Sequence, residues 1–326
     1  MLNKLKKNFS TDKIGLILAL IVIVLIFSTF NPNYLSSTNM VNILIAASLT
    51  GLVAIAETYL IIAGLIDLST GSVAAFASVL AAVLIQKGMG FIPMLLVVIV
   101  AGLFVGWLNA LAVNKLKLEP FIATLATMSI LRGMAFIICD GRPVYIMNKT
   151  FINFGKNRIF GLPIPVIILI LAFIVFGVLL AKTRFGRSVY VVGGNKNAAR
   201  LAGLNPQKIT NILYMITGGL SALGGIILAA RMSSGQPAAS VGLEFDAITA
   251  AVLGGTAFTG AVGTIFGTVL GVLILQGFNT GLIMLNVPVF WQYVARGLLL
   301  LIALAFDYLR KQNREKKLLE SSMKQS

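Results

Sequence analysis

The sequence predicts an all-α integral membrane protein, a polytopic bundle of about ten transmembrane helices. Two features carry this prediction. Charged residues make up only 11% of the 326 residues, against 58% hydrophobic residues, so there are too few charges to cover the surface of a soluble domain of this size. The hydrophobic residues also gather in runs of about 20, the length that a helix needs to cross the hydrocarbon layer.

Ten apolar runs account for the expected helices. Their bounds are 14–30, 41–62, 69–86, 92–113, 120–138, 163–181, 209–230, 245–260, 263–284 and 289–306. The eighth run is interrupted by Gly254, Gly255 and Gly260, which favours a broken or re-entrant helix there. The runs are too long and continuous for the alternating strands of a membrane β-barrel.

The distribution of basic residues predicts the orientation of the chain, because cytoplasmic segments of membrane proteins carry an excess of Lys and Arg. Most of the 26 basic residues fall in an N-tail (1–13), a turn at 114–119, a long segment at 182–208 and a C-tail (307–326). We therefore expect both termini in the cytoplasm, with a transmembrane domain over 14–306. The segment 139–162 is discordant, since it carries four basic residues and is expected outside: Arg142, Lys149, Lys156 and Arg158.

The net charge of +16 follows from these tails and turns, which meet anionic lipid at the membrane surface. Basic and aromatic residues do not alternate in the manner of RNA-binding surfaces. The sequence therefore indicates membrane lipid as a partner, and no nucleic acid.

The two halves of the chain share an order of features: an aspartate, an asparagine that follows a glycine, a proline, and an Arg-Gly pair. In the first half these are Asp67, Asn109, Pro120 and Arg132, and in the second half Asp246, Asn279, Pro288 and Arg296. Internal duplication is the usual construction of transporters, with the substrate path between the halves. The alternative is that two apolar, Gly-rich regions resemble each other by composition alone.

The sequence offers no motif for catalysis. It lacks a phosphate loop, a dinucleotide fingerprint and a nucleophile elbow. It has no histidine and one cysteine, Cys139, which disfavours a multi-ligand zinc site and His-based acid–base chemistry. We expect a non-catalytic chain with no cofactor and no metal.

Polar residues within the apolar runs are the candidates for helix caps or for the transport pathway. They are Asp67, Ser69, Asn109, Asp246 and Asn279. We expect the two aspartates to cap helix N-termini and complement the helix dipole. The alternative is an ion-coupled secondary transporter that uses Asp67, Asp246 or Glu57 as its coupling carboxylate. Arg132 and Arg296 are expected to snorkel toward an interface.

Glycines predict close helix packing. Gly263, Gly267 and Gly271 are spaced four residues apart, so on a helix they would share one face, where a second helix can approach closely.

The segment 182–208 is the most informative part of the chain. It contains no acidic residue and is long for a turn between membrane helices. Residues 197–202 can form a short helix that begins near Asn195 or Asn197 and is stopped by Gly203 and Pro206. A small helix at the cytoplasmic face favours docking of another protein, and the alternative is a basic turn held by lipid headgroups.

This segment resembles the cytoplasmic coupling loop of ABC-importer permeases. Their Glu-Ala-Ala-x-x-x-Gly motif is matched by Asn197-Ala198-Ala199-x-x-x-Gly203, with Asn in place of Glu. Nearly the whole chain is similar to the ribose-type permeases of monosaccharide importers. The matching stretches are 64–72, 119–125, 242–248 and 250–256.

The resemblance implies a bacterial plasma-membrane subunit that passes a monosaccharide, such as ribose, inward by alternating access. It implies a second permease copy or related permease, ATPase subunits on separate chains, and an extracytoplasmic sugar-binding protein. It also implies that the coupling loop contacts the ATPase through Arg187, Asn197, Ala198, Ala199, Arg200 and Gly203.

Overall fold

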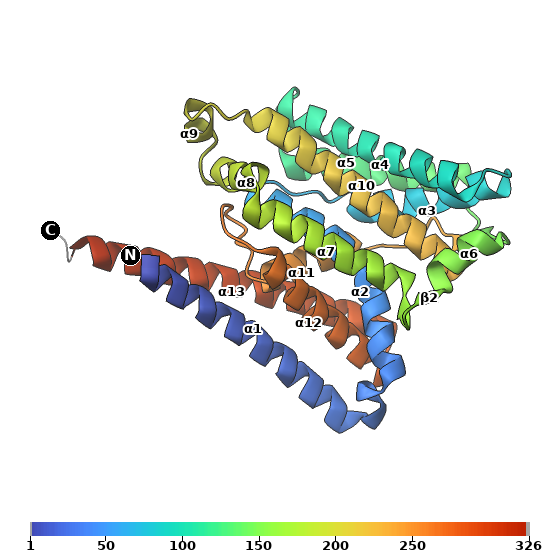
Figure 1. Ribbon diagram of the computed structural model, residues 1–326, viewed down its shortest axis with the longest axis horizontal. Helices are drawn as coiled ribbons and strands as arrows, with labels where there is room; N and C mark the ends of the chain where they lie inside the picture. The colour runs from blue at the N-terminus through green and yellow to red at the C-terminus, as the bar shows by residue number, and fades with distance from the viewer. Residues whose placement is uncertain (1, 324–326) are drawn as a thin grey trace.

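The computed structural model describes residues 2–323 as a bundle of helices (Figure 1). The first part of the chain forms α1 (Leu2–Phe30), the short 3-10 helix η1 (Pro32–Leu35), α2 (Ser37–Ile62), α3 (Thr70–Gln86), α4 (Phe91–Asn114) and α5 (Pro120–Ile138). The remainder forms α6 (Lys149–Lys156), α7 (Ile164–Lys182), α8 (Arg184–Gly194), α9 (Lys196–Leu201), α10 (Pro206–Met232), α11 (Leu243–Leu253), α12 (Ile265–Met284) and α13 (Val289–Met323). The expected tails fall on α1 and α13, except that residues 1 and 324–326 lie outside the described residues.

Apolar helices dominate the bundle, which confirms a polytopic helical membrane protein. Within residues 2–323, 7 helices are long and apolar enough to cross a membrane, namely α2, α4, α5, α7, α10, α12 and the Val289–Leu309 part of α13. Two shorter apolar helical segments are Ile14–Phe30 of α1 and Thr70–Gln86, which is α3.

The break predicted within the 245–260 run is present, and only its first part is helical. Helix α11 has 11 residues and ends at Leu253, and the chain runs without a helix to Thr264. Gly255 and Gly260 have φ angles of 88° and 87°, a left-handed conformation that breaks a helix and that glycine adopts without steric cost.

The predicted all-α fold class is confirmed, and the described chain adds two short antiparallel strand pairs between helices. Strand β1 (Val144–Tyr145) pairs with β4 (Ser234–Gly235), and β2 (Arg158–Ile159) pairs with β3 (Leu162–Pro163). Each strand has two residues, too few to produce an alternating pattern in the sequence. The β1–β4 pair fastens segment 139–162 to the end of α10.

Two long helices, α2 and α10, organise the packing. Helix α10 packs against α3 and α4, and α2 packs against α11 and α12, while α2 and α10 also contact each other. Glycines allow the closest approaches, because a Cβ on Gly218 would lie 2.0 Å from the carbonyl oxygen of Gly102. Small residues at helix crossings are typical of membrane proteins.

The predicted three-glycine face on one helix is reduced to two glycines. Thr264 caps α12 by accepting a hydrogen bond from the Gly267 N–H at 3.1 Å, so the helix begins at Ile265 and Gly263 precedes it. A Cβ on Gly267 would lie 2.0 Å from the Gly254 carbonyl oxygen, and one on Gly271 would lie 1.9 Å from that of Ala250. Both glycines therefore hold α12 against α11.

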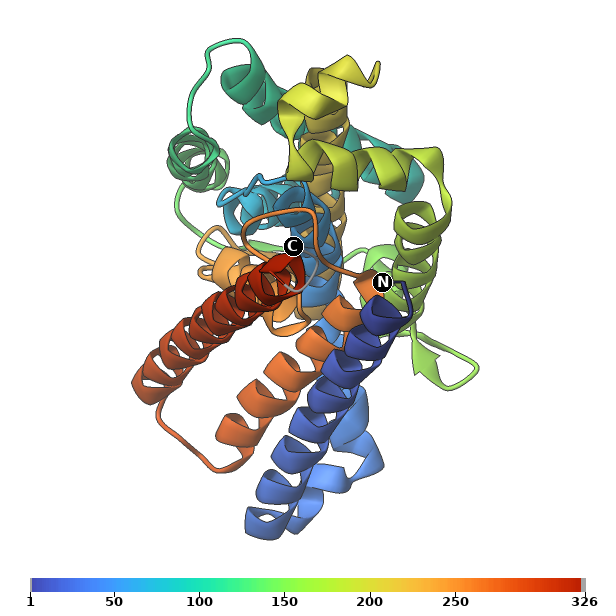
Figure 2. The ribbon, with the colours of Figure 1, turned by 90° about the vertical axis from the view of Figure 1, so that its left-hand side faces the viewer.

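The two ends of the bundle differ. Helices α8 and α9, the start of α1 and the end of α13 lie at one end, toward the left of Figure 1, and α6 and the β2–β3 hairpin lie at the other. Figure 2 looks onto the end that carries α8 and α9. The segments that the charge pattern expects in the cytoplasm thus share one end of the molecule.

Candidate functional site

The segment between α7 and α10 folds into two short helices, α8 and α9, each begun by a side-chain cap. The Thr183 hydroxyl accepts a hydrogen bond from the Gly186 N–H at 3.1 Å and so caps α8. The Asn195 side-chain oxygen Oδ1 accepts from the Asn197 N–H at 2.9 Å and the Ala198 N–H at 3.0 Å, and so caps α9. Such caps satisfy backbone donors that have no partner within the helix.

Helix α8 is embedded in the end of the bundle. Val189 and Val192 are buried in the core that α2 also enters. The Tyr190 hydroxyl donates to the Gly263 carbonyl oxygen at 2.7 Å, and burial raises the pKa of Tyr190. The backbone of Gly193 lies directly against that of Ile62, where an added Cβ would be 1.7 Å from the Ile62 oxygen. Helix α8 therefore touches both the last residue of α2 and the loop before α12.

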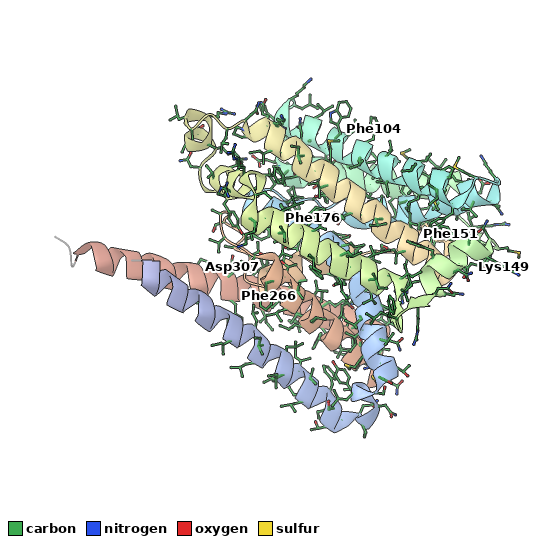
Figure 3. All side chains as sticks on the ribbon, in the orientation of Figure 1. Phe104, Lys149, Phe151, Phe176, Phe266 and Asp307 are labelled. Atoms are coloured by element: carbon green, nitrogen blue, oxygen red, sulfur yellow. The ribbon has the colours of Figure 1, made fainter. Side chains whose placement is uncertain are left out.

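Aromatic contacts add a second connection between α2 and the segment around α8. The Tyr59 hydroxyl donates to the Phe176 carbonyl oxygen at 2.5 Å, and its ring stacks on that of Phe185 with centroids 6.3 Å apart. Figure 3 shows Phe176 on the flank of α7, which leads into α8. Helix α8 and the residues just before it are therefore joined to α2 through packed side chains as well as through the backbone.

Most of the residues that the sequence predicts to contact a partner lie on the surface of α8 and α9. The exposed ones are Arg187, Asn197, Ala198, Arg200 and Gly203. Ala199 instead is fully buried, so it seats α9 on the bundle and cannot present surface to a partner. Leu201, which the sequence reasoning missed, is 92% exposed.

A second group of predicted residues gathers where α3 begins. Asp67 Oδ1 accepts from the Ser69 N–H at 2.8 Å and the Ser69 hydroxyl at 2.6 Å. The Asn109 Nδ2 donates to Asp67 Oδ2 at 3.3 Å and to the Ser69 hydroxyl oxygen at 3.0 Å. The Thr127 hydroxyl donates to the Asn109 Oδ1 at 2.6 Å. Asp67 thus orders the turn ahead of α3, whose N-cap residue is Ser69.

The loop 63–69 is fastened to three further helices. The Leu68 N–H donates to the Thr124 hydroxyl on α5 at 3.1 Å, and the Tyr214 hydroxyl on α10 donates to the Ile66 carbonyl oxygen at 2.9 Å. Asn109 adds the connection to α4. Ile62 contacts Gly193 of α8, and the loop 63–69 begins at the next residue. Asp67 and Ser69 are therefore only a few positions along the chain from the residue that touches α8.

The matching residues of the second half are placed differently. Asp246 forms an ion pair with Arg296 at 3.7 Å, and the N-cap of α11 is Gly242, which has no capping side chain. The prediction that Asp246 caps this helix is therefore wrong, although an acidic residue in the first turn still complements the dipole. Asn279 is buried in α12, and its Oδ1 has no hydrogen-bond partner among the described residues.

The two arginines expected to snorkel also have defined partners. Arg132 Nη1 donates to the carbonyl oxygens of Pro237 at 2.8 Å and Ala239 at 2.6 Å, and so holds the loop before α11. Arg296 pairs with Asp246, as described above. Both contacts join helices to neighbouring elements, which hydropathy patterns do not reveal.

Two buried carboxyl groups complete the interior. Glu57 of α2 is 0% exposed, and neither of its carboxyl oxygens has a hydrogen-bond partner within residues 2–323. Glu244 is 5% exposed, and its carboxyl group packs against Gly71 of α3. A Cβ added to Gly71 would lie only 2.3 Å from Glu244 Oε2. Glu244 lies in no sequence motif that would have indicated its burial. No group of three or more His, Cys, Asp or Glu in the described part of the chain is placed to hold a metal ion.

Comparison with known proteins places the chain among transport permeases. Residues 39–304 match the family described as the branched-chain amino acid transport system / permease component. The chain belongs to this permease family. It is 41% identical to the ribose import permease protein of Bacillus subtilis (strain 168), over 91% of this chain and 92% of that protein. It is 40% identical to the L-arabinose transport system permease protein of Escherichia coli (strain K12), over 93% of each.

A further relative is the ribose import permease protein of Escherichia coli (strain K12), which is 38% identical over 89% of this chain and 92% of that protein. No solved structure matches the chain. These relatives confirm the resemblance of the sequence to the ribose-type permeases, and the permease is a multi-pass membrane protein.

Proposed function

We propose that this permease is the membrane-spanning subunit of an importer that passes a monosaccharide, ribose or a related sugar, into the cell by alternating access. ATP hydrolysis on separate ATPase subunits drives the cycle. Similarity along nearly the whole chain to ribose and arabinose permeases, at 41% and 40% identity, supports the sugar class. The observation that carries the mechanism is the α8–α9 segment, which is exposed on one side and packed on α2 on the other.

The exposed side of α8 and α9 is the proposed docking surface for an ATPase subunit. Leu201 offers an apolar contact on α9, and the exposed Arg187 of α8 and Arg200 of α9 add positive charge. A docked subunit that moves α8 would press on the Ile62 backbone through Gly193. The displacement would then reach the loop 63–69 and the start of α3. Arg187, Asn197, Ala198, Arg200 and Gly203 are the proposed contact residues.

The proposed pathway residues are Asp67, Ser69 and Asn109, with Asn279 and Asp246 as their counterparts in the second half. The proposed internal repeat pairs α2 with α10, α3 with α11, α4 with α12 and α5 with α13. Its support is the exchanged packing, in which α2 contacts α11 and α12 while α10 contacts α3 and α4. Transporters built from such repeats bind substrate between the halves.

The proposed assembly contains a second permease copy or a related permease, ATPase subunits and an extracytoplasmic sugar-binding protein. The proposed topology has ten crossings, with a cytoplasmic N-tail (1–13), the permease domain (14–306) and a cytoplasmic C-tail (307–326). The common end of α8, α9 and both termini (Figure 1) supports this arrangement, as does the bias of basic residues toward these segments.

Site-directed crosslinking tests the coupling role. In a Cys139→Ser background, Leu201→Cys should crosslink to the ATPase subunit when the complete importer is assembled in membranes. Phe160→Cys is the control, because this residue is fully exposed at 101% but lies in the β2–β3 turn at the opposite end. Equal crosslinking at both positions, or none at position 201, would contradict the proposal.

A transport assay separates the proposal from ion-coupled transport. Labelled ribose and arabinose should enter proteoliposomes only when ATP, the ATPase and the binding protein are all present. Uptake driven by an ion gradient, with no ATPase present, would favour a secondary transporter that uses Asp67, Asp246 or Glu57.

A further inference from the structure

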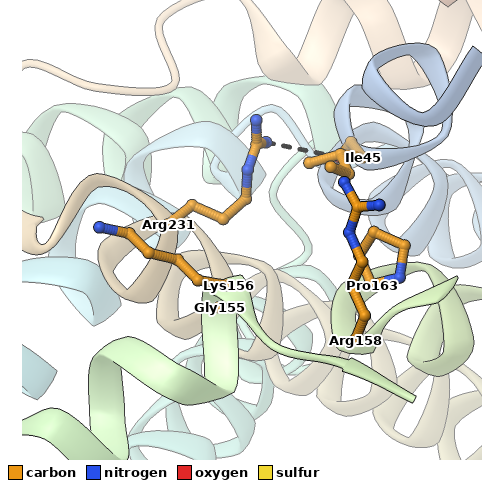
Figure 4. Close-up of a pocket in the computed structure, with 6 residues that line it drawn as sticks. All are labelled: Ile45, Gly155, Lys156, Arg158, Pro163 and Arg231. Atoms are coloured by element: carbon orange, nitrogen blue, oxygen red, sulfur yellow. Dashed lines mark hydrogen bonds between the residues drawn. The ribbon is translucent and has the colours of Figure 1, made fainter. Parts of the chain in front are cut away.

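The described surface carries a cationic pocket at the end opposite α8 and α9. Its volume is about 210 Å³, and it is lined by Ile45, Gly155, Lys156, Arg158, Pro163 and Arg231 (Figure 4). Three of its six lining residues are basic and none is acidic. Two of them, Lys156 and Arg158, belong to the 139–162 segment whose charge runs against the positive-inside pattern.

The pocket is held in place by well-packed elements. Helix α6 is anchored by Phe151, which is fully buried and makes an edge contact with Phe91 at a ring-centroid distance of 6.1 Å. Figure 3 shows Phe151 and Lys149 on α6 at this end of the molecule. A Cβ on Gly155 would lie 2.5 Å from the Ala230 carbonyl carbon, so α6 lies directly on the end of α10. Lys156 and Arg231 thus come from two helices in tight contact.

The positive charge of the pocket is not neutralised by carboxylates. Among the described residues, one ion pair is present, between Arg296 and Asp246. Lys156, Arg158 and Arg231 of the pocket form no ion pair with a carboxylate of the described residues. Arg231 Nη1 donates to the Ile45 carbonyl oxygen at 3.4 Å (Figure 4). Lys156 and Arg231 also sit in the last turns of α6 and α10, where the helix dipole offsets part of their charge. Arg158 does not lie at the end of a helix and has no such compensation, so the pocket keeps positive charge that an anion would offset.

The β2–β3 hairpin beside the pocket carries an apolar tip. Ile159 is 46% exposed, Phe160 101% and Leu162 38%. The hairpin projects sideways from the bundle in Figure 2, next to the start of α7. Along its length α7 also exposes apolar side chains, namely Ile170, Ile174 and Val178. Apolar and aromatic groups next to basic ones are typical of the membrane interface, where the former enter the acyl region and the latter meet headgroups.

We propose that this pocket binds the phosphate of an anionic phospholipid headgroup, with the Ile159–Leu162 tip packed against the lipid chains. Lys156, Arg158 and Arg231 supply the charge-assisted hydrogen bonds, and arginine binds phosphate oxygens with two parallel N–H groups. Basic pockets between membrane helices are suited to such headgroups. The site explains why this segment keeps basic residues that the topology pattern disfavours.

Lipid titration of the purified full-length permease, read by native mass spectrometry, tests the site. Phosphatidylglycerol should bind in preference to phosphatidylcholine. The variant Lys156→Gln/Arg158→Gln should bind phosphatidylglycerol roughly tenfold or more weakly, since each change removes a hydrogen bond to a charged group. The matched control is Arg142→Gln/Lys149→Gln, which removes the same charge from the same segment outside the pocket and should bind within about twofold of wild type. Gel filtration verifies folding, and the single change Arg158→Gln, at an exposed side chain, serves if the double variant aggregates.

Further arms distinguish the lipid from other anions. Phe160→Ser should weaken phosphatidylglycerol binding, and excess inorganic phosphate should not displace the lipid. Displacement by inorganic phosphate would overturn the proposal in favour of a free-anion site. It would also be overturned by equal losses in the pocket and control variants, or by no effect of Phe160→Ser. Unchanged lipid binding, with loss of stimulation by an extracytoplasmic binding protein, would instead identify a protein-docking surface.

Discussion

The contact between Gly193 of α8 and Ile62 of α2 gives a sharp prediction. In Gly193→Ala, the new Cβ would lie 1.7 Å from the Ile62 oxygen, whereas ordinary contacts begin at 3.4 Å. The backbones must therefore separate by roughly 1.7 Å, the difference between these two distances. The Ile62 oxygen cannot turn away freely, because it accepts a hydrogen bond from the Ala261 N–H at 2.8 Å.

The neighbouring glycine provides the matched control. A Cβ on Gly194 would meet the Ala261 Cβ at 3.6 Å, which is an ordinary contact. Both substitutions add the same methyl group near the end of α8, and both gain up to ~1 kcal/mol of helix propensity. The difference in unfolding free energy between the two variants therefore isolates the effect of the clash. Overpacking of this kind costs about 1–3 kcal/mol.

Two measurements check this prediction. The apparent melting temperature of the purified permease should fall for Gly193→Ala and should hold or rise slightly for Gly194→Ala. In the assembled importer, the sugar transported per ATP hydrolysed should fall for Gly193→Ala alone. If the two variants behave alike in both assays, then α8 does not act on α2 through this contact.

Three further substitutions test the other contacts. Asn109→Ala removes the amide that bonds to Asp67 and Ser69, so it should lower stability by about 1–3 kcal/mol, measured by thermal unfolding in detergent; an unchanged melting temperature would show that the cluster does not hold the loop. Leu201→Ser should weaken ATPase association in pull-down assays and leave the melting temperature unchanged, because the side chain is 92% exposed; a stability loss instead would mean that Leu201 packs against the permease. Arg132→Gln should increase protease cleavage or hydrogen exchange in the 236–242 loop, because it frees the Pro237 and Ala239 carbonyl oxygens. Arg132→Lys should restore part of the protection. Equal protection in the wild type and both variants would contradict a role of Arg132 in holding the loop.

Helix positions were predictable where hydrophobicity extends over a full membrane crossing. The run from Pro163 predicts the helix that the structure places at Ile164–Lys182. The glycines of the eighth run predicted a break in α11, but the apolar residues that continue beyond Leu253 left its last helical residue open. Hydropathy does not encode the φ angle of a glycine, so the boundary could not be read from composition.

The candidate site was predictable to the extent that it depends on local sequence. Asn195 precedes a run with good helix-forming residues, and the short helix α9 follows from that cap and from Gly203. The burial of Ala199 and the exposure of Leu201 depend on how α9 rests on the bundle, which is a tertiary property. Asp67 and Asn109 are 42 positions apart, so their contact required the fold, and Asp246 and Arg296 are still farther apart in sequence.

The fastening of the loop 63–69 has a mechanical consequence. Its backbone and side chains are attached to α4, α5 and α10, so it cannot act as a slack tether between α2 and α3. A push on Ile62 must either break several hydrogen bonds within the membrane, where no water replaces them, or carry the attached helices along. In the proposed coupling mechanism, the second course would convert a small shift at α8 into the tilting of the attached helices. On that proposal the loop would serve as a rigid joint, because its hydrogen bonds attach it to α4, α5 and α10.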